Sequence, residues 1–144
     1  FGVLARVSGL ISARGFNIDS LTVSTTEDPT ISRMTIVVDA DAQKLEQVKR
    51  QLARLIDVIE VQELTEGTFI DRELLLARVN ANGTTRQELE RLAAQCGGKL
   101  ADATDSSVVI EAAGDTKVLD RLIEQLRPHG ITKLVRTGRV ALEK

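Results

Sequence analysis

Aromatic residues, cysteine and histidine are scarce in this sequence. Its 144 residues include three Phe, no Tyr and no Trp, so the core must be aliphatic, built from Leu, Ile, Val and Ala. The single cysteine, Cys96, cannot form an internal disulfide, which fits a reducing compartment. The single histidine, His129, has no cysteine or carboxylate cluster beside it at metal-ligand spacing, and we expect it in an exposed turn. The sequence therefore predicts neither a disulfide-stapled scaffold nor a metal centre.

Strong charge of either sign and long apolar runs are also missing. The formal net charge is −2 and the sequence pI is about 5.5, so the chain lacks the basic patch typical of nucleic-acid binding. No apolar run approaches the ~18 residues of a membrane span, and the sequence shows no signal-peptide pattern. Hydrophobic residues make up 42% and charged residues 28%, ordinary values for a globular protein. We expect a cytoplasmic protein.

The apolar spacing in the first 66 residues predicts a helix, two strands, a second helix and a closing strand. Apolar residues fall on one face of a helix from Gly2 to Arg14, and Gly15 ends it. Residues 16–24 are rich in strand formers, and a slip in their alternation between Ile18 and Leu21 indicates a bulge or bend. The remaining expected elements are a turn at 26–29, a strand at 34–38, a helix over 45–55 capped by Asp39 or Asp41, and a strand at 58–64.

The second half repeats this order after one additional strand. Residues 73–79 form that strand, and Thr85 with Glu88 makes a capping-box pattern for a helix ending at Gly97-Gly98. Cys96 lies on the apolar stripe of this helix, so we expect it in the core. The elements expected next are strands at 100–104 and 108–112, a helix capped by Asp115 and ended by Pro128, and a strand at 131–137. The order is β-α-β-β-α-β, the split βαβ arrangement of ferredoxin-like folds.

Apolar positions in the two halves match at fixed offsets. Adding 74 to the helix residues Leu45, Val48 and Leu52 gives Leu119, Leu122 and Leu126, and adding 82 to Val7, Leu10 and Gly15 gives Leu89, Leu92 and Gly97. The sequence therefore predicts an α+β protein with two ferredoxin-like (βαββαβ) domains in tandem. By this template the first domain lacks its opening strand, and we expect the natural protein to carry roughly ten more residues before Phe1.

Several segments closely resemble the small subunits of acetohydroxyacid (acetolactate) synthase. In the first half these are GVLARVSGLI at 2–11, RGFNIDSLTV at 14–23, SRMTIVV at 32–38 and QLARLIDV at 51–58. In the second half they are DRELLLARV at 71–79 and RTGRVAL at 136–142. Ile11 departs from the family, which usually carries Phe there. The resemblance implies that residues 1–66 form an N-terminal ACT effector-binding domain and residues 72–144 a C-terminal ferredoxin-like or ACT-like domain.

The resemblance also implies a regulatory, non-catalytic role. Small subunits of this family activate a catalytic large subunit and confer feedback inhibition by valine or another branched-chain amino acid. Thiamine diphosphate, magnesium and FAD would belong to the large subunit, so no cofactor and no metal are expected in this chain. ACT domains commonly pair side by side, which implies a homodimer with effector sites at its interface. The alternative is a stand-alone amino-acid-sensing ACT protein that regulates a different biosynthetic enzyme.

The candidate effector site is the turn into the first helix together with the start of the next strand. A helix N-terminus offers unpaired N–H groups and partial positive charge, which suit a carboxylate, and Gly2 places no Cβ in the way. Asn17 offers an acceptor for an ammonium group and donors for a carboxylate. The remaining candidates are the N–H groups of Val3 and Leu4, with Leu4 and Ile18 as apolar neighbours for an isopropyl group. In the family an asparagine ahead of the first helix also holds the effector, and no residue here matches it.

Each of these residues also has an ordinary structural role to weigh. A glycine before a helix is usually a turn residue, Asn17 fits a strand end, and Leu4 and Ile18 fit a core. Arg136 and Arg139 fit a solvated basic edge, with contact to the catalytic subunit as the alternative. Two other function classes stay open on this fold. RNA-binding domains stack bases on strand aromatics, which this acidic chain lacks. A small acylphosphatase-like hydrolase would need a nucleophile–base pair or a phosphate loop, and neither pattern is visible.

Overall fold

The computed structural model describes residues 2–144, which form two compact units. Unit 1 comprises the chain up to Phe69 together with Glu143 and Lys144, and unit 2 comprises Ile70–Leu142. The chain therefore passes between the units twice. No helix in residues 2–144 combines the length and apolar character needed to cross a membrane.

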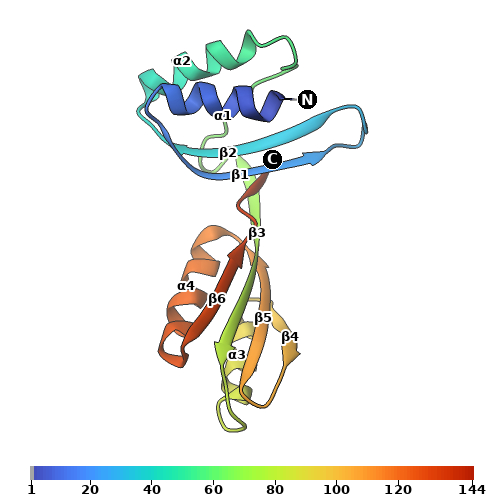
Figure 1. Ribbon diagram of the computed structural model, residues 1–144, viewed down its shortest axis with the longest axis vertical. Helices are drawn as coiled ribbons and strands as arrows, with labels where there is room; N and C mark the ends of the chain where they lie inside the picture. Colours follow the sequence, from blue (N-terminus) through green and yellow to red (C-terminus); the bar gives the residue numbers. More distant parts are fainter. Residues whose placement is uncertain (1) are drawn as a thin grey trace. The chain divides into compact units, whose positions relative to one another are not determined.

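Unit 1 packs two helices against a two-stranded antiparallel sheet (Figure 1). Its elements are α1 (Val3–Ala13), β1 (Asn17–Thr25), β2 (Ser32–Asp39) and α2 (Ala42–Ala53). The β1–β2 register shifts between Ile18 and Ser20, which confirms the predicted irregularity. The buried core lies between the helices and the sheet and consists of Val7, Ile11, Phe16, Val48 and Leu52.

Two local signals of unit 1 act as the sequence predicts. Gly15 ends α1 with a φ of 79°, a conformation that costs a residue with a Cβ more than it costs glycine. Of the two candidate caps for α2, Asp41 is the one used, because its Oδ1 accepts a hydrogen bond of 2.8 Å from the Lys44 N–H. Asp39 is instead the last residue of β2.

The predicted closing strand at 58–64 is wrong for this structure, which has no strand there. A strand exists only when its backbone groups pair with a neighbour. In the βαββαβ plan the closing strand pairs with the opening strand of its unit, and α1 is the first element in residues 2–69. Val61 nevertheless packs against the unit 1 core. The apolar pattern therefore predicts its burial correctly, although the backbone there is not a strand.

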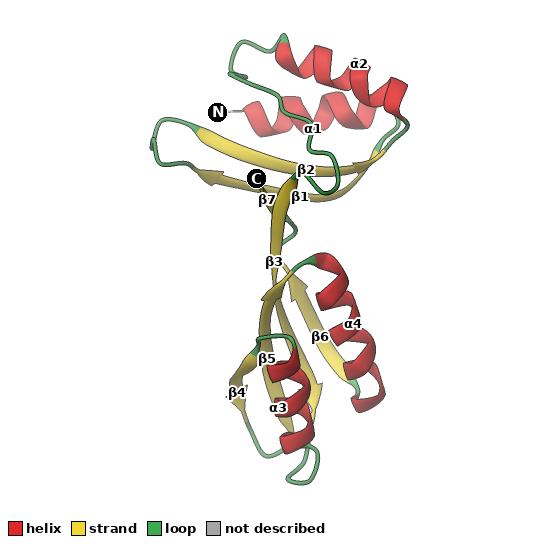
Figure 2. Ribbon diagram, turned by 180° about the vertical axis from the view of Figure 1, so that it is seen from behind, coloured by secondary structure: helices red, strands yellow, loops and turns green. Residues whose placement is uncertain are grey.

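Unit 2 contains a five-stranded antiparallel sheet with two helices on one face (Figure 2). Its elements are β3 (Phe69–Asn80), α3 (Arg86–Gln95), β4 (Lys99–Ala103), β5 (Ser107–Gly114), α4 (Thr116–Leu126), a short 3₁₀ turn (Arg127–His129), β6 (Ile131–Arg136) and β7 (Val140–Glu143). The strand order is β4-β5-β3-β6, and β7 also pairs with β3. This is the ferredoxin-like order, with the first strand of the plan in the centre.

The core of unit 2 follows the predicted periodicities. Alternate residues of β3 are buried against the helices, namely Leu75, Ala77 and Val79, and α4 buries Leu119, Leu122 and Leu126. Cys96 packs partly buried against this core, as expected. Asp115 caps α4 by accepting a 2.9 Å hydrogen bond from the Val118 N–H. The α+β prediction with ferredoxin-like units is confirmed.

At α3 the predicted cap residue is confirmed, but the predicted capping-box bond of its side chain does not form. The Thr85 side chain makes no capping bond to the helix. The Asn82 side chain instead closes the turn before the helix, because its Oδ1 accepts hydrogen bonds of 3.0 Å from the N–H groups of both Thr84 and Thr85. The Asn82 carbonyl oxygen accepts from the Arg86 N–H at 3.1 Å in this turn, and the Thr85 carbonyl oxygen accepts the first helical bond, from the Leu89 N–H at 3.0 Å. Thr85 does hold the predicted N-cap position, but its hydroxyl accepts a 2.9 Å hydrogen bond from the Asn82 N–H and makes no bond to the helix.

Candidate functional site

The N-terminus of α1 is the best-defined part of the predicted site. Gly2 occupies the cap position with a φ of 80°, its carbonyl oxygen accepts from the Arg6 N–H at 3.0 Å, and no side chain caps the helix. By contrast, Asp41 caps α2 and Asp115 caps α4. The first-turn N–H groups, including those of Val3 and Leu4, are therefore left for a ligand or solvent, and the helix dipole makes this end attractive to a carboxylate.

Arg6 adds a positive charge at the same place and was missed by the sequence reasoning. A Cβ built on Gly2 would lie 3.7 Å from Arg6 Nη1, so the guanidinium lies directly beside the helix entrance. Another nitrogen of the same guanidinium pairs with the carboxylate of Asp57, in the loop after α2. Because residues four apart share a face of a helix, the spacing from Gly2 to Arg6 was the available signal.

Of the three apolar candidates, Leu4 is exposed, whereas Val3 and Ile18 belong to the core of unit 1. Leu4 is 43% exposed and is free to contact a ligand. Val3 and Ile18 are half-buried and pack against the unit 1 core, with Ile18 directly opposite Val38 on the sheet. Ile18 therefore contributes chiefly to stability, while Leu4 is the apolar side chain available at the helix entrance.

Asn17 is the exposed first residue of β1, and its side chain makes no hydrogen bond to residues 2–144. Its cross-strand partner is Asp39. Directly opposed residues of an antiparallel pair have Cβ atoms about 5 Å apart, so the amide and the carboxylate are neighbours. The sequence predicts Asp39 only as a candidate helix cap, because its position opposite Asn17 depends on the strand register across the bulge.

Gly2 directly precedes α1, and Asn17 begins β1, which starts near the C-terminal end of that helix (Figure 1). The helix has 11 residues, which at 1.5 Å per residue is about 16 Å. A free amino acid spans only about 5 Å, given bond lengths near 1.5 Å. One copy of the chain therefore cannot place both residues on one small ligand, and any site that uses both must combine two copies.

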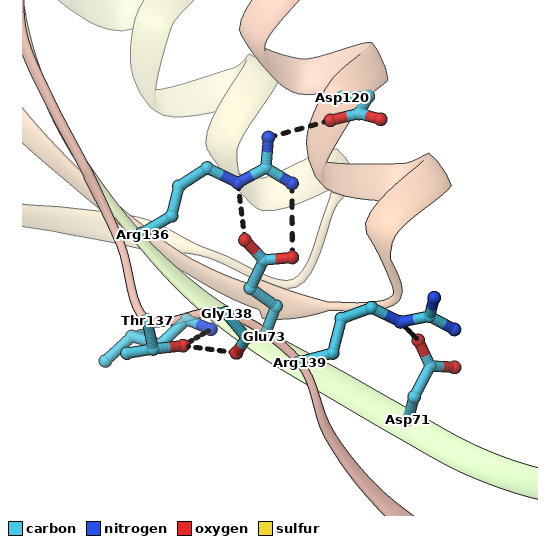
Figure 3. Close-up of polar contacts among 8 residues, drawn as sticks. Asp71, Glu73, Asp120, Arg136, Thr137, Gly138 and Arg139 are labelled. Atoms are coloured by element: carbon cyan, nitrogen blue, oxygen red, sulfur yellow. Dashed lines mark hydrogen bonds and ion pairs between the residues drawn. The ribbon is translucent and has the colours of Figure 1, made fainter. Parts of the chain in front are cut away.

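Arg136 and Arg139 do not form the predicted solvated basic edge, because both guanidinium groups are engaged in ion pairs (Figure 3). Arg136 contacts both carboxylate oxygens of the buried Glu73 and also Asp120 at 2.9 Å, and the carboxylate of Glu73 raises the pKa of Arg136. Arg139 pairs with Asp71 at 2.8 Å. These pairs fasten the segment after β6 to β3, which is a structural role.

The remaining candidates stay outside the site. His129 lies in the 3₁₀ turn after α4 and is half-buried rather than exposed as predicted. Across residues 2–144 no three His, Cys, Asp or Glu side chains gather closely enough to hold a metal ion.

Two family models match the chain, one over each of its units. The family model for the AHAS small subunit-like ACT domain matches residues 1–60, and that for the small subunit of acetolactate synthase matches residues 72–144. The chain is 44% identical to the acetolactate synthase small subunit of Haemophilus influenzae over 99% of this chain and 88% of that protein. It is 41% identical to the isozyme 3 small subunit of Escherichia coli, with the same coverage of both chains.

A solved structure agrees with the sequence comparisons. The crystal structure of the acetolactate synthase small subunit from Thermotoga maritima superposes with a TM-score of 0.90 at 31% identity, covering 99% of this chain and 89% of that one. The similarity thus extends over both units, and the range matched by the ACT-domain model contains the positions of Gly2, Arg6, Asn17 and Asp39.

Proposed function

Because this chain belongs to the family of acetolactate synthase small subunits, we propose that it activates the catalytic large subunit of that enzyme and confers feedback inhibition by a branched-chain amino acid. The observation that carries the regulatory part is the uncapped N-terminus of α1 beside Arg6, in the domain that matches an ACT model. The chain itself performs no catalysis in this proposal. Thiamine diphosphate, magnesium and FAD act on the large subunit.

The effector site we propose is shared between two copies of the chain. The α1 entrance of one copy supplies the N–H groups of Val3 and Leu4 and the charge of Arg6 for the effector's carboxylate. Asn17 of the second copy supplies a side-chain oxygen for the ammonium group. Leu4 contacts the aliphatic side chain. The length of α1, roughly 16 Å for its 11 residues, separates the two positions within one copy and supports this arrangement, since a homodimer can bring the two ends together.

Inhibition follows as a population shift. An amino acid bound across two copies favours one arrangement of the pair, and the catalytic subunit also prefers one arrangement. The two binding events are then coupled, typically by about 1–3 kcal/mol, which changes an affinity 5- to 150-fold. The isopropyl group of valine suits Leu4 in size and polarity, and leucine and isoleucine are the competing candidates.

Reconstitution with the large subunit tests the proposal. Acetolactate production is measured for the large subunit alone and after adding the full natural small subunit, with valine, leucine and isoleucine titrated in turn. We expect an increase in turnover on adding the small subunit and a decrease with one of the three amino acids. Full turnover by the small subunit alone, or activation without inhibition by any of the three, would contradict it.

A further inference from the structure

The sheet of unit 2 has helices on one face only, and its other face carries exposed apolar side chains. The helices α3 and α4 cover the face that buries the alternate residues of β3 (Figure 2). On the opposite face Leu74 is 41% exposed, Leu76 39% and Val135 54%. Single exposed apolar residues are ordinary, whereas neighbouring ones on one face are typical of a contact surface.

The strand register shows which side chains stand beside one another on this open face. Directly paired residues of an antiparallel sheet point to the same side, so each set of paired residues forms a row across β4, β5, β3 and β6. The rows are Asp102, Val109, Arg78 and Lys133; then Lys99, Glu111, Leu76 and Val135; and then Ala113 and Leu74. These ten residues define the open face.

The charges of the open face are divided between its two edges. Asp102 on β4 and Lys133 on β6 are exposed, and neither has an ion-pair partner within residues 2–144. Three strand spacings, about 14 Å, separate them, so they cannot meet within one chain. Lys99 and Glu111 in the second row pair with each other at 3.8 Å. The first row therefore has a free acid at one edge and a free base at the other.

The third row combines a projecting side chain with a hollow. A cavity of about 330 Å³ lies beside Leu74, and its lining includes Gly98, Lys99, Glu111 and Ala113. The small residues Gly98 and Ala113 leave room there for an apolar side chain from outside. Such a hollow next to an exposed leucine suits a surface that meets a copy of itself, because each copy supplies both parts.

We propose that the open face of unit 2 binds the open face of a second copy of this chain. A two-fold axis parallel to the strands places β4 of one copy over β6 of the other, and β5 over β3, with each row against the same row. Asp102 then lies over Lys133 of the second copy, and Leu74 lies over Ala113 of the second copy, at the hollow. The proposal goes beyond the proposed effector site, which uses unit 1.

The size of the open face is sufficient for such a contact. The strands β3 and β5 pair over eight residues, which is about 27 Å, and four strands are about 19 Å wide. Two copies would therefore cover about 1,000 Å² in total, near the lower limit for a specific interface. An interface of this size should respond clearly to a change in one charge pair.

Cross-linking tests the proposed register. Asp102→Cys and Lys133→Cys are combined in the full natural chain carrying Cys96→Ser, and the protein is treated with a short bismaleimide. We expect covalent dimers on a denaturing gel, because the two positions oppose each other only between copies. Glu90→Cys with Arg121→Cys, on the exposed sides of α3 and α4, is the matched control and should stay monomeric. Monomers alone, or equal dimer yields from both variants, would overturn the proposal.

Charge reversal measures the contribution of the edge pair. Sedimentation equilibrium of the full natural chain gives the Kd of self-association. Asp102→Lys alone and Lys133→Asp alone should each raise this Kd by about 10-fold or more, because like charges then face each other twice per dimer. The double variant should return close to the wild-type Kd. Unchanged Kd values in the single variants, or no recovery in the double variant, would contradict the pairing. Failure of the proposed function leaves both tests unaffected, since neither uses valine or the large subunit.

Discussion

Arg136 holds Glu73 by both carboxylate oxygens, with Nε 2.5 Å from Oε1 and Nη2 3.2 Å from Oε2. The pair joins the end of β6 to β3, residues 63 positions apart in the chain. The Glu73 side chain is only 5% exposed and that of Arg136 is 28% exposed, so the carboxylate depends on this partner for the solvation it has lost. The adjoining Thr137 bonds the backbone of Leu74 in both directions, which continues the attachment.

Removing the guanidinium should destabilise unit 2. Arg136→Ala leaves a buried carboxylate without its partner, and we expect a loss of about 3 kcal/mol in the free energy of unfolding by urea. Arg91→Ala is the matched control, since its exposed guanidinium lies 4.0 Å from Glu88 and should contribute less than about 1 kcal/mol. Equal losses in the two variants would show that the Glu73 pair contributes no more than a surface contact.

The contribution of the Arg136–Glu73 pair to the free energy of unfolding should not change at moderately alkaline pH. The hydrogen bond to Glu73 raises the pKa of Arg136 above its ordinary, already strongly basic value. The stabilisation is therefore fully present below that ordinary pKa and is lost only as the pH rises through the raised pKa. The difference in unfolding free energy between wild type and Arg136→Ala should therefore stay constant from about pH 7 to about pH 10. A difference that shrinks steadily over this range would mean that another group carries the interaction.

Asn17→Ala should weaken the effector without abolishing activation. Loss of one hydrogen bond to a charged group costs about 1.5–3 kcal/mol, a 10- to 150-fold weaker affinity for valine. Calorimetry measures the affinity, and acetolactate production with the large subunit measures activation. Ser24→Ala, on the exposed far end of the same strand, is the control and should change neither. Unchanged valine affinity in Asn17→Ala would remove this residue from the site.

Mixing two defective variants tests whether the site is shared. In a pair of one Gly2→Asp chain and one Asn17→Ala chain, one of the two sites combines the intact Gly2 of one copy with the intact Asn17 of the other. Random mixing in equal amounts makes half of the dimers mixed, so about a quarter of all sites should bind valine normally. Calorimetry after co-refolding counts them. No recovery beyond the separate variants would place the whole site within one chain.

Replacing Gly98 by alanine should destabilise unit 2, because even a methyl group does not fit there. A Cβ there would lie 2.4 Å from the Glu111 carbonyl oxygen and 3.0 Å from the Ala112 Cβ, so β4 would have to move away from β5. We expect Gly98→Ala to lose about 2–3 kcal/mol of unfolding free energy. Gly83→Ala, where nothing lies within 4 Å, is the control and should be neutral or slightly stabilised. Similar stabilities for both variants would refute the close approach.

Asp28 should titrate below an ordinary aspartate. Its Oδ1 accepts from the Thr30 N–H at 2.9 Å and from the Thr30 hydroxyl at 2.7 Å, and these bonds lower its pKa from 3.8. The contribution to stability is present above pH 3.8 and is lost as the pH falls through the lowered pKa. An NMR titration of the carboxyl carbon reports the midpoint, which Thr30→Val should move upward and Thr30→Ser should leave in place.

Local patterns in the sequence predicted most elements because their determinants are local. The alternation of β3, the caps Asp41 and Asp115, and the slip after Ile18 each depend on neighbouring residues. The strand expected at 58–64 failed because a strand also needs a partner, which no local pattern supplies. The pairing of β7 with β3 was missed for the same reason, since Gly138, with a φ of 89°, turns the chain back onto a strand some 70 residues earlier.

The candidate site was predictable in its residue types and less so in its neighbours. A glycine at a helix entrance and an asparagine at a strand start have a chemistry that the sequence displays. Arg6 lies beside Gly2 because the two share one face of the helix, and Asp39 lies opposite Asn17 because of the strand register. The bulge shifts that register by one residue. The length of α1, by contrast, was predicted, and it is what separates Gly2 from Asn17.

The double passage of the chain between its units has a consequence for biosynthesis. The Glu143 carboxylate accepts a hydrogen bond from the Gln62 side chain, and the Lys144 N–H donates to the Thr68 carbonyl oxygen. Residues synthesised before unit 2 and residues synthesised after it therefore meet in unit 1. During synthesis Gln62 and Thr68 leave the ribosome first, and residues 70–142 follow. Glu143 and Lys144, the hydrogen-bond partners of Gln62 and Thr68, emerge last. Unit 1 can therefore complete these contacts only after the whole of unit 2 has emerged.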